Sequence, residues 1–106
     1  MKVISQSKEW TYTVELRGEL DHHSTCDVIQ KMELTLDSVM PKRLILDFAG
    51  VTFMDSSGIA LVVRAQRRMA RIGGSAVLCN VPPQAKKVFD AAGITRMVPI
   101  IEEEKI

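Results

Sequence analysis

The chain has 106 residues, of which 46% are hydrophobic and 25% charged, values typical of one folded domain with its own core and not of a disordered segment. Fourteen basic and thirteen acidic side chains leave a formal net charge of +1, so no field of one sign is present to hold a nucleic-acid backbone. The apolar runs fall far short of the roughly 20 residues that span a bilayer, and the first residues lack a signal-peptide hydrophobic region, so we expect a cytoplasmic protein.

The beginning of the chain has the pattern of two short strands. Residues 3–5 are predicted to form the first strand, residues 6–9 a polar turn, and residues 10–16 the second strand. In the second strand apolar and polar side chains alternate, which is typical of a strand with one covered face. Residues 18–23, Gly-Glu-Leu-Asp-His-His, are expected to connect this strand to a helix.

A first helix is predicted to begin at Ser24, a favourable N-cap residue, with Asp27 three residues later completing a pair like a capping box. Pro41 ends this helix, because proline cannot continue a helical hydrogen-bond ladder. The apolar face of the helix is formed by Val28, Ile29, Met32, Leu36 and Val39. Leu34 lies off this face.

Residues 44–48 are predicted to form a strand covered on both faces, since this apolar run has no helical period. After a short link, a second apolar run ends in the turn Asp55-Ser56-Ser57-Gly58 and leads directly into a helix. This second helix is expected from Ser56 to Ile72, where Gly73-Gly74 forms a C-cap signature. Its inward side is formed by Ile59, Val62, Val63, Met69 and Ala70, and its outward side by Arg64, Arg67, Arg68 and Arg71.

The last third of the chain adds a strand, a helix and a further strand. Residues 75–79 form the strand, and Pro82-Pro83 begins the helix, which Gly93 ends. The inward side chains of this helix are Ala85, Val88, Phe89 and Ala92. Residues 97–101 form an edge strand, because Pro99 cannot donate to a ladder, and residues 102–106 an acidic tail.

Strands that alternate with helices predict an α/β fold in a single domain over residues 1–106, with a four- to five-stranded, mostly parallel sheet and an antiparallel N-terminal strand. Ligands of such sheets gather at the carboxyl ends of the strands. We expect that edge to group Asp21, Asp55, Ser56, Ser57 and Asn80. Because a helix start has unpaired N–H groups and the positive end of the helix dipole, we expect the function to reside at Ser56 or Ser57.

Residues 53–59, Phe-Met-Asp-Ser-Ser-Gly-Ile, resemble the signature of bacterial anti-sigma-factor antagonists, the STAS-domain family. Residues 18–23 resemble a second block of that family, closest to its sporulation-type member. The resemblance covers nearly the whole chain and implies one STAS domain. The chain departs from the family pattern where it stops soon after Ile101, since relatives usually carry a further C-terminal helix.

The resemblance implies a protein that binds an anti-sigma factor, which is also a serine kinase, and so frees a sigma factor. That kinase phosphorylates the serine directly after the aspartate, here Ser56, and a serine phosphatase restores it. The partner surface is expected to include Asp21, Asp55, Ser57, Gly58 and Leu61. No motif in the sequence indicates a catalytic residue, cofactor or metal, and the net charge and short apolar runs predict no nucleic-acid or membrane partner.

The same residues also have plainer interpretations. Ser56 at a helix start can be only a cap, Ser57 can cap or pack, and Asp55 can end the strand through an Asx-turn instead of orienting the serine hydroxyl. Leu61 can belong to the edge of the core or to an interface. Adjacent histidines at 22–23, without a third ligand at a fitting spacing, favour loop or interface residues over a metal site. The four arginines form a solvated face or meet an acidic groove on the kinase.

Three other classes of protein remain as alternatives. A serine hydrolase would need His22 or His23 to approach Ser56, and a phosphoaspartate receiver would use Asp47 but lacks the acidic pair expected near the first strand. A STAS module that does not switch could dock inside a stress-signalling complex or a lipid transporter.

Cys26 and Cys79 are expected to be buried, reduced thiols, with a disulfide or metal site as the minor alternative.

Overall fold

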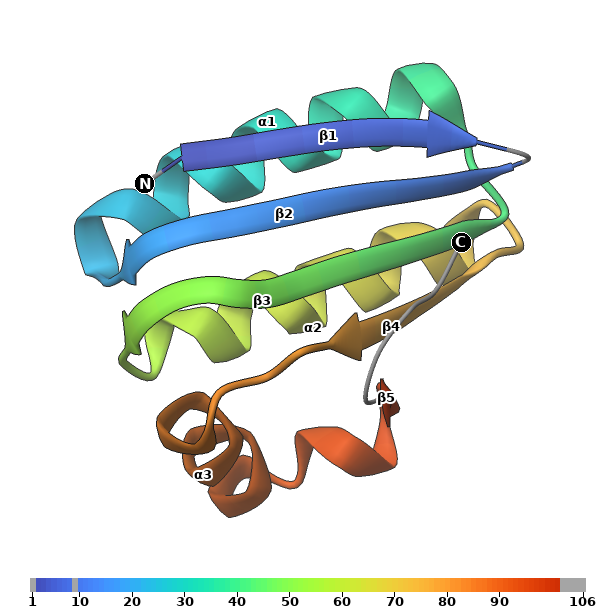
Figure 1. Ribbon diagram of the computed structural model, residues 1–106. Helices are drawn as coiled ribbons and strands as arrows, with labels where there is room; N and C mark the ends of the chain where they lie inside the picture. Colours follow the sequence, from blue (N-terminus) through green and yellow to red (C-terminus); the bar gives the residue numbers. More distant parts are fainter. Residues whose placement is uncertain (1, 9, 102–106) are drawn as a thin grey trace.

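The computed structural model describes residues 2–8 and 10–101 of the chain. Its elements, in chain order (Figure 1), are β1 Lys2–Lys8, β2 Thr11–Leu20, α1 His22–Val39, β3 Arg43–Met54, α2 Ser57–Arg71, β4 Ser75–Cys79, α3 Pro83–Ala92, the 3-10 helix η1 Ile94–Arg96 and β5 Ile100–Ile101. The predicted α/β alternation in a mostly parallel sheet is confirmed. Among the described helices, none combines the length and the apolar character that crossing a membrane requires.

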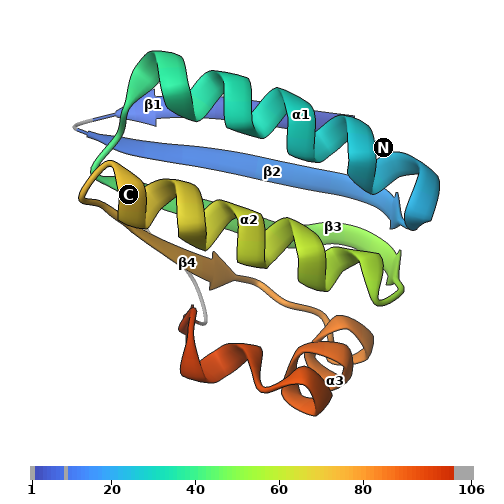
Figure 2. The ribbon, with the colours of Figure 1, turned by 180° about the vertical axis from the view of Figure 1, so that it is seen from behind.

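The strands form one sheet in the order β1-β2-β3-β4-β5. β2, β3, β4 and β5 pair in parallel, whereas β1 pairs antiparallel with β2. Neighbouring parallel strands joined by crossovers of one hand place the connecting helices on the same face. Figures 1 and 2 accordingly show α1 and α2 side by side on one face of the sheet, and α3 past the carboxyl end of β4. The strand ends that lead into α1 and α2 therefore meet at one edge.

The main core lies between the sheet and helices α1 and α2. In β2, Tyr12, Val14 and Leu16 are buried at alternate positions, as the period of two predicts. The helices contribute Val28, Met32, Leu36, Leu61, Val62, Ala65 and Met69. The rings of Phe48 and Phe89 meet edge to face with centroids 5.5 Å apart, which joins α3 to this core.

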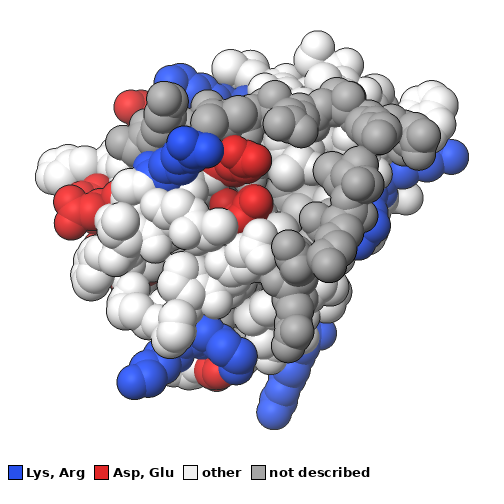
Figure 3. Space-filling view, viewed as in Figure 1, with Lys and Arg blue, Asp and Glu red and all other residues white. Residues whose placement is uncertain are grey.

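The opposite face of the sheet is also covered in part. Ile45 is buried there in a second, smaller cluster with Val77 and Cys79, so the predicted burial of β3 on both faces is confirmed at this position. In the space-filling view of this side, basic and acidic side chains lie interspersed with uncharged ones (Figure 3). A mixed surface of this kind agrees with the formal net charge of +1.

The strands are longer than the hydrophobic pattern predicted. Residues 6–8 were expected in a turn but pair with residues 11–13 of β2, while residue 9 lies outside the described residues. Residues 18–20 continue β2, and the expected link at residues 49–50 lies within β3. Backbone pairing needs no apolar side chain, so the hydrophobic pattern stops before the ladder does. At Gly50 a Cβ would lie 2.7 Å from Cγ of Arg17, so glycine allows the close approach of β2.

Several residues predicted to face the core are exposed. Trp10 is 69% exposed because it lies in the turn before β2, in the left-handed conformation (φ 70°), where the Lys42 ammonium lies 5.6 Å from the centroid of its ring. Val39, Ala70 and Ala92, each near the end of a helix, are also exposed. Leu34 is 71% exposed, which confirms that it lies off the apolar face.

The strand predicted over residues 97–101 forms only at its end, where Ile100–Ile101 pair with β4. The short helix η1 lies just before the predicted range, and its residue Ile94 is buried. Gly93 adopts the left-handed conformation (φ 71°) and ends α3, as predicted. The acidic tail and any cover that it provides for the last strand lie outside the described residues.

Candidate functional site

The turn between β3 and α2 presents the hydroxyl of Ser56 at the surface. Asp55 ends the strand and its Oδ1 accepts a hydrogen bond of 2.8 Å from the backbone N–H of Ser57, which is an Asx-turn. Ser56 occupies the N-cap position of α2, but its side chain makes no capping hydrogen bond. Asp55 supplies the oxygen that a capping serine would otherwise supply. The exposed Ser56 hydroxyl is therefore not engaged in holding the helix start.

Asp21 forms the neighbouring turn, at the start of α1. Its Oδ1 accepts hydrogen bonds from the backbone N–H groups of His23 (3.0 Å) and Ser24 (2.9 Å), and Ser24 Oγ accepts one from the backbone N–H of Asp21 (3.1 Å). This capping box corrects the predicted N-cap at Ser24 and its predicted pair with Asp27. The helix begins earlier because Asp21 follows directly on the last residue of β2, where the strand ladder stops.

The hydrogen bonds that Asp21 accepts, foremost that of the Ser24 backbone N–H, lower the pKa of its carboxyl. A carboxyl whose pKa is lowered by folding stabilises the fold above its unfolded value, here 3.8, and this contribution disappears as the pH falls through the folded pKa. We expect Asp21→Asn, which keeps a capping oxygen but does not titrate, to weaken the acid dependence of the unfolding free energy. Urea denaturation at a series of pH values from about 5 to 2 measures this. An identical acid dependence in the two proteins would contradict the assignment.

The structure brings the Asp21 turn and the Asp55 turn together. Leu20 and Met54 are partners in the parallel ladder of β2 and β3. The backbone N–H of Asp55 donates to the carbonyl oxygen of Leu20 over 3.2 Å. Asp21, Asp55 and Ser56 thus share one edge of the sheet.

Asn80 does not join this edge. Its Nδ2 donates to Oδ1 of Asp47 over 3.2 Å, because β4 ends at Cys79, which pairs with Asp47. β3 continues from Asp47 to Met54, roughly 20 Å of further strand at about 3.3 Å a residue. The expectation that Asn80 lies at the same edge as Asp21 and Ser56 is wrong, because β4 ends well before β3 does.

Gly58 and Leu61, expected at the partner surface, are buried in this chain. Leu61 has no exposed area. A Cβ on Gly58 would lie 2.3 Å from Sδ of Met54, so glycine lets α2 pack closely against the end of β3. Both residues lie beneath the surface of the turn, and Leu61 belongs to the core in this conformation.

A residue that the sequence analysis did not single out holds the end of β3. The Gln84 side chain, on α3, accepts from the backbone N–H of Met54 (2.9 Å) and donates to its carbonyl oxygen (2.8 Å). This pair of bonds fixes the last residue of β3, one residue before Asp55. Gln84 and Met54 are thirty positions apart in the chain, so no local signal could have revealed the contact.

We expect Gln84→Ala to speed hydrogen exchange of the Met54 amide, because that N–H then loses its acceptor. Gln84→Glu keeps an acceptor for this N–H but loses the donor to the Met54 carbonyl oxygen, so its protection should be intermediate. Amide exchange measured by NMR on both variants tests this. Equal exchange rates in the unchanged chain and in Gln84→Ala would show that Gln84 does not hold the strand end.

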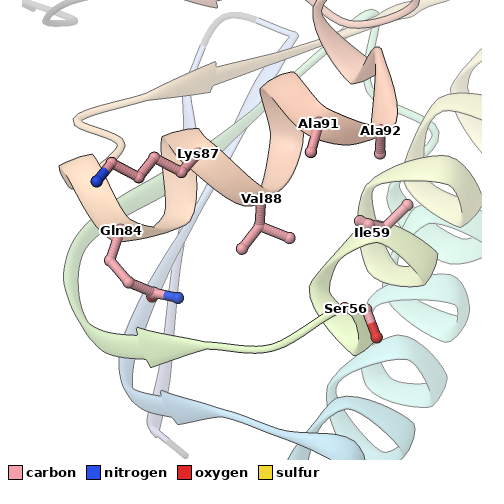
Figure 4. A pocket seen from close by; sticks show the side chains of 7 residues that line it. All are labelled: Ser56, Ile59, Gln84, Lys87, Val88, Ala91 and Ala92. Carbon is pink, nitrogen blue, oxygen red and sulfur yellow. The ribbon is translucent and has the colours of Figure 1, made fainter.

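Gln84 also lies on the wall of a groove between α2 and α3 that runs beside Ser56. Its lining residues (Figure 4) are Ser56, Ile59, Gln84, Lys87, Val88, Ala91 and Ala92. We call this the α2–α3 groove. The Ser56 oxygen points away from α3, so Ser56 borders the groove without filling it (Figure 4).

Two of the four arginines on α2 bind α1. Nη1 of Arg68 contacts Asp37 at 2.7 Å, and the Nε atoms of Arg68 and Arg64 lie 3.2 and 3.3 Å from Glu33. Asp37 raises the pKa of Arg68 by accepting these hydrogen bonds. The interpretation as a wholly solvated face therefore fails for this pair, which joins the two helices above the core.

The histidines and cysteines form no site in the described part of the chain. Within it no group of three His, Cys, Asp or Glu side chains is placed to hold a metal ion, and His22 and His23 are exposed. Neither cysteine forms a disulfide within the described residues, and only Cys79 is buried. The expected burial of Cys26 is wrong, because Cys26 lies on the outer side of α1.

Comparisons with known proteins agree with these features. A family model described as the STAS domain matches residues 2–105. Anti-sigma F factor antagonists from Lysinibacillus sphaericus and Paenibacillus polymyxa are 33% and 30% identical, over 91% and 86% of this chain and 83% and 78% of theirs. The solved structure of the anti-sigma factor antagonist SpoIIAA in its unphosphorylated form matches with a TM-score of 0.83 and 28% identity, over 96% of this chain and 90% of that one. The phosphorylated form of the Bacillus cell fate determinant SpoIIAA matches with a TM-score of 0.75, 28% identity and coverage of 96% and 93%.

Proposed function

This chain belongs to the STAS-domain family, and from that premise we propose that it is an anti-sigma factor antagonist controlled by phosphorylation of Ser56. In the unphosphorylated form it binds an anti-sigma factor and so releases a sigma factor. The anti-sigma factor is also the serine kinase that inactivates the chain, and a serine phosphatase reverses the modification. Its relatives named anti-sigma F factor antagonists support an anti-sigma factor as the partner.

The observation that carries this proposal is that Ser56 is exposed and that its hydroxyl makes no capping hydrogen bond. A kinase needs a serine oxygen that it can reach and that no structural bond holds. Ser57 meets these conditions less well, because it is half-buried and its backbone N–H is fixed by Asp55. SpoIIAA, which has a similar fold, has been solved in both a phosphorylated and an unphosphorylated form.

The fold tolerates a phosphate at this position. Phosphorylation adds about 1.5 to 2 negative charges and three acceptor oxygens. At the start of α2 these charges meet the positive end of the helix dipole, which favours them. The switch is therefore a local change in charge and fit, and does not require refolding.

The partner surface that we propose surrounds Ser56. Asp55 and Asp21 lie at the same edge and place negative charge beside the hydroxyl. A phosphate added there strengthens this negative charge and repels a carboxylate-rich partner surface that docks against the helix start. Ser57, Gly58 and Leu61 shape the turn from within.

In this proposal the chain acts in the cytoplasm by binding, without catalysis of its own, and its sequence blocks favour a sporulation programme. The alternative is a STAS adaptor that docks in a larger stress-signalling or transport assembly and is never phosphorylated. Incubation with the kinase-type anti-sigma factor of the same genome and ATP separates the two.

Mass spectrometry of the incubated chain should find one phosphate, on Ser56. Ser56→Ala should remain unmodified, and Ser57→Ala should still be modified at Ser56. Phosphate on Ser57 would refute the assignment of the site. An unmodified chain that still binds the anti-sigma factor would favour the adaptor.

A further inference from the structure

The α2–α3 groove leaves apolar side chains accessible at the surface. Ile59 and Val88 pack against the core but remain partly accessible, and Ala91 and Ala92 are exposed. In Figure 4 these four side chains face the space between the two helices. Exposed apolar surface with a polar rim is typical of an interaction site on a soluble protein.

The rim of the groove favours negative charge in a partner. Lys87 is exposed and extends from α3 at the end of the groove away from Ser56 (Figure 4). A segment lying in the groove would therefore meet apolar side chains along its length and the Lys87 ammonium at one end.

We propose that the α2–α3 groove receives an apolar side chain of the anti-sigma factor, flanked by a partner carboxylate that pairs with Lys87. This inference rests on the proposed function, because Ser56 belongs both to the modified site and to the wall of the groove. A partner that reaches the Ser56 hydroxyl with its nucleotide also covers the neighbouring groove. The groove then supplies apolar contact area that the polar Asp21–Asp55 edge lacks.

A substitution in the groove and a phosphate on Ser56 change different parts of the surface. The Ser56 oxygen points away from α3, so a phosphate lies beside the groove and not in it (Figure 4). Changes inside the groove should therefore weaken the complex while leaving the Ser56 hydroxyl itself competent as a phosphate acceptor.

The test uses a glutamate placed in the groove and one placed outside it. Ala91 and Ala70 are both exposed and each is the last but one residue of its helix, α3 and α2, so Ala91→Glu and Ala70→Glu change helix propensity and charge alike. Binding to the kinase-type anti-sigma factor of the same genome is measured by titration calorimetry. We expect Ala91→Glu to bind about 30-fold more weakly than the unchanged chain, the effect of losing one central interface contact. Ala70→Glu should bind as the unchanged chain does.

Lys87→Glu provides a second variant that leaves the helix and the core unchanged. It should also bind more weakly, and added salt should restore part of its affinity, because salt screens the new contact between like charges. At raised kinase concentration both groove variants should reach the same final phosphorylation of Ser56 as the unchanged chain.

Equal affinities of Ala91→Glu, Lys87→Glu and Ala70→Glu would overturn the inference. If Ser56→Asp still abolished binding in that case, the proposed function would stand without the groove. A chain that did not bind the anti-sigma factor at all would overturn both.

Discussion

Ser56→Asp is expected to bind the anti-sigma factor about a thousandfold more weakly than the unchanged chain, a difference of about 4 kcal/mol. One desolvated contact between like charges costs several kcal/mol, so a single added carboxylate at the helix start suffices. Asp55 and Asp21 at the same edge add to the repulsion. Ser56→Ala should keep the affinity of the unchanged chain, since the hydroxyl makes no capping hydrogen bond.

Two measurements separate a local switch from a loss of folding. Ser75→Asp places the same charge on an exposed residue at the start of β4 and should leave affinity unchanged. Urea denaturation should give nearly equal unfolding free energies for the unchanged chain, Ser56→Asp and the phosphorylated protein. A change in unfolding free energy larger than the change in binding would contradict the local mechanism.

Leu61→Ala is expected to lower the free energy of unfolding by about 2–5 kcal/mol, the usual result of emptying a fully buried leucine site. Leu61 has no exposed area and packs where α2 faces the sheet. Leu34→Ala is the matched control, because Leu34 is 71% exposed on α1 and its loss should change stability by no more than about 0.5 kcal/mol.

The same pair of variants separates a core role from an interface role for Leu61. A core residue lowers the denaturation midpoint, and the folded fraction of Leu61→Ala then binds the anti-sigma factor normally. An unchanged unfolding free energy together with weaker binding would instead show that Leu61 reaches the partner through a conformational change.

Much of the candidate site could be predicted because its determinants are local. An Asp-Ser-Ser-Gly turn between an apolar run and an amphipathic pattern places Ser56 at a helix start, and capping depends only on neighbouring residues. Both ends of α3 could likewise be predicted from local backbone preferences, because Pro82-Pro83 favours a helix start and Gly93 a helix end. The predicted start of α1 was wrong because Ser24 and Asp21 are both good capping residues. The end of β2 at Leu20 determined that Asp21 caps the helix.

The contacts between distant segments could not be read from a pattern of nearest neighbours. Gln84 holds Met54 across thirty residues, and Arg68 binds Asp37 on another helix. Asn80 was expected beside Ser56 because both follow strands, yet β4 is too short to bring it there. These contacts depend on strand lengths and helix rotations that the sheet and core set together.

The amino-acid sequence by itself determined the alternation of strands and helices and the position of Ser56 at a helix start, because hydrophobic period and backbone preference act over a few residues. Tertiary structure alone decided that Leu61 is fully buried and that a groove opens beside the serine. Each of these outcomes depends on how α2 lies against β3 and α3. That placement follows from close packing of side chains far apart in the chain, which no local pattern encodes.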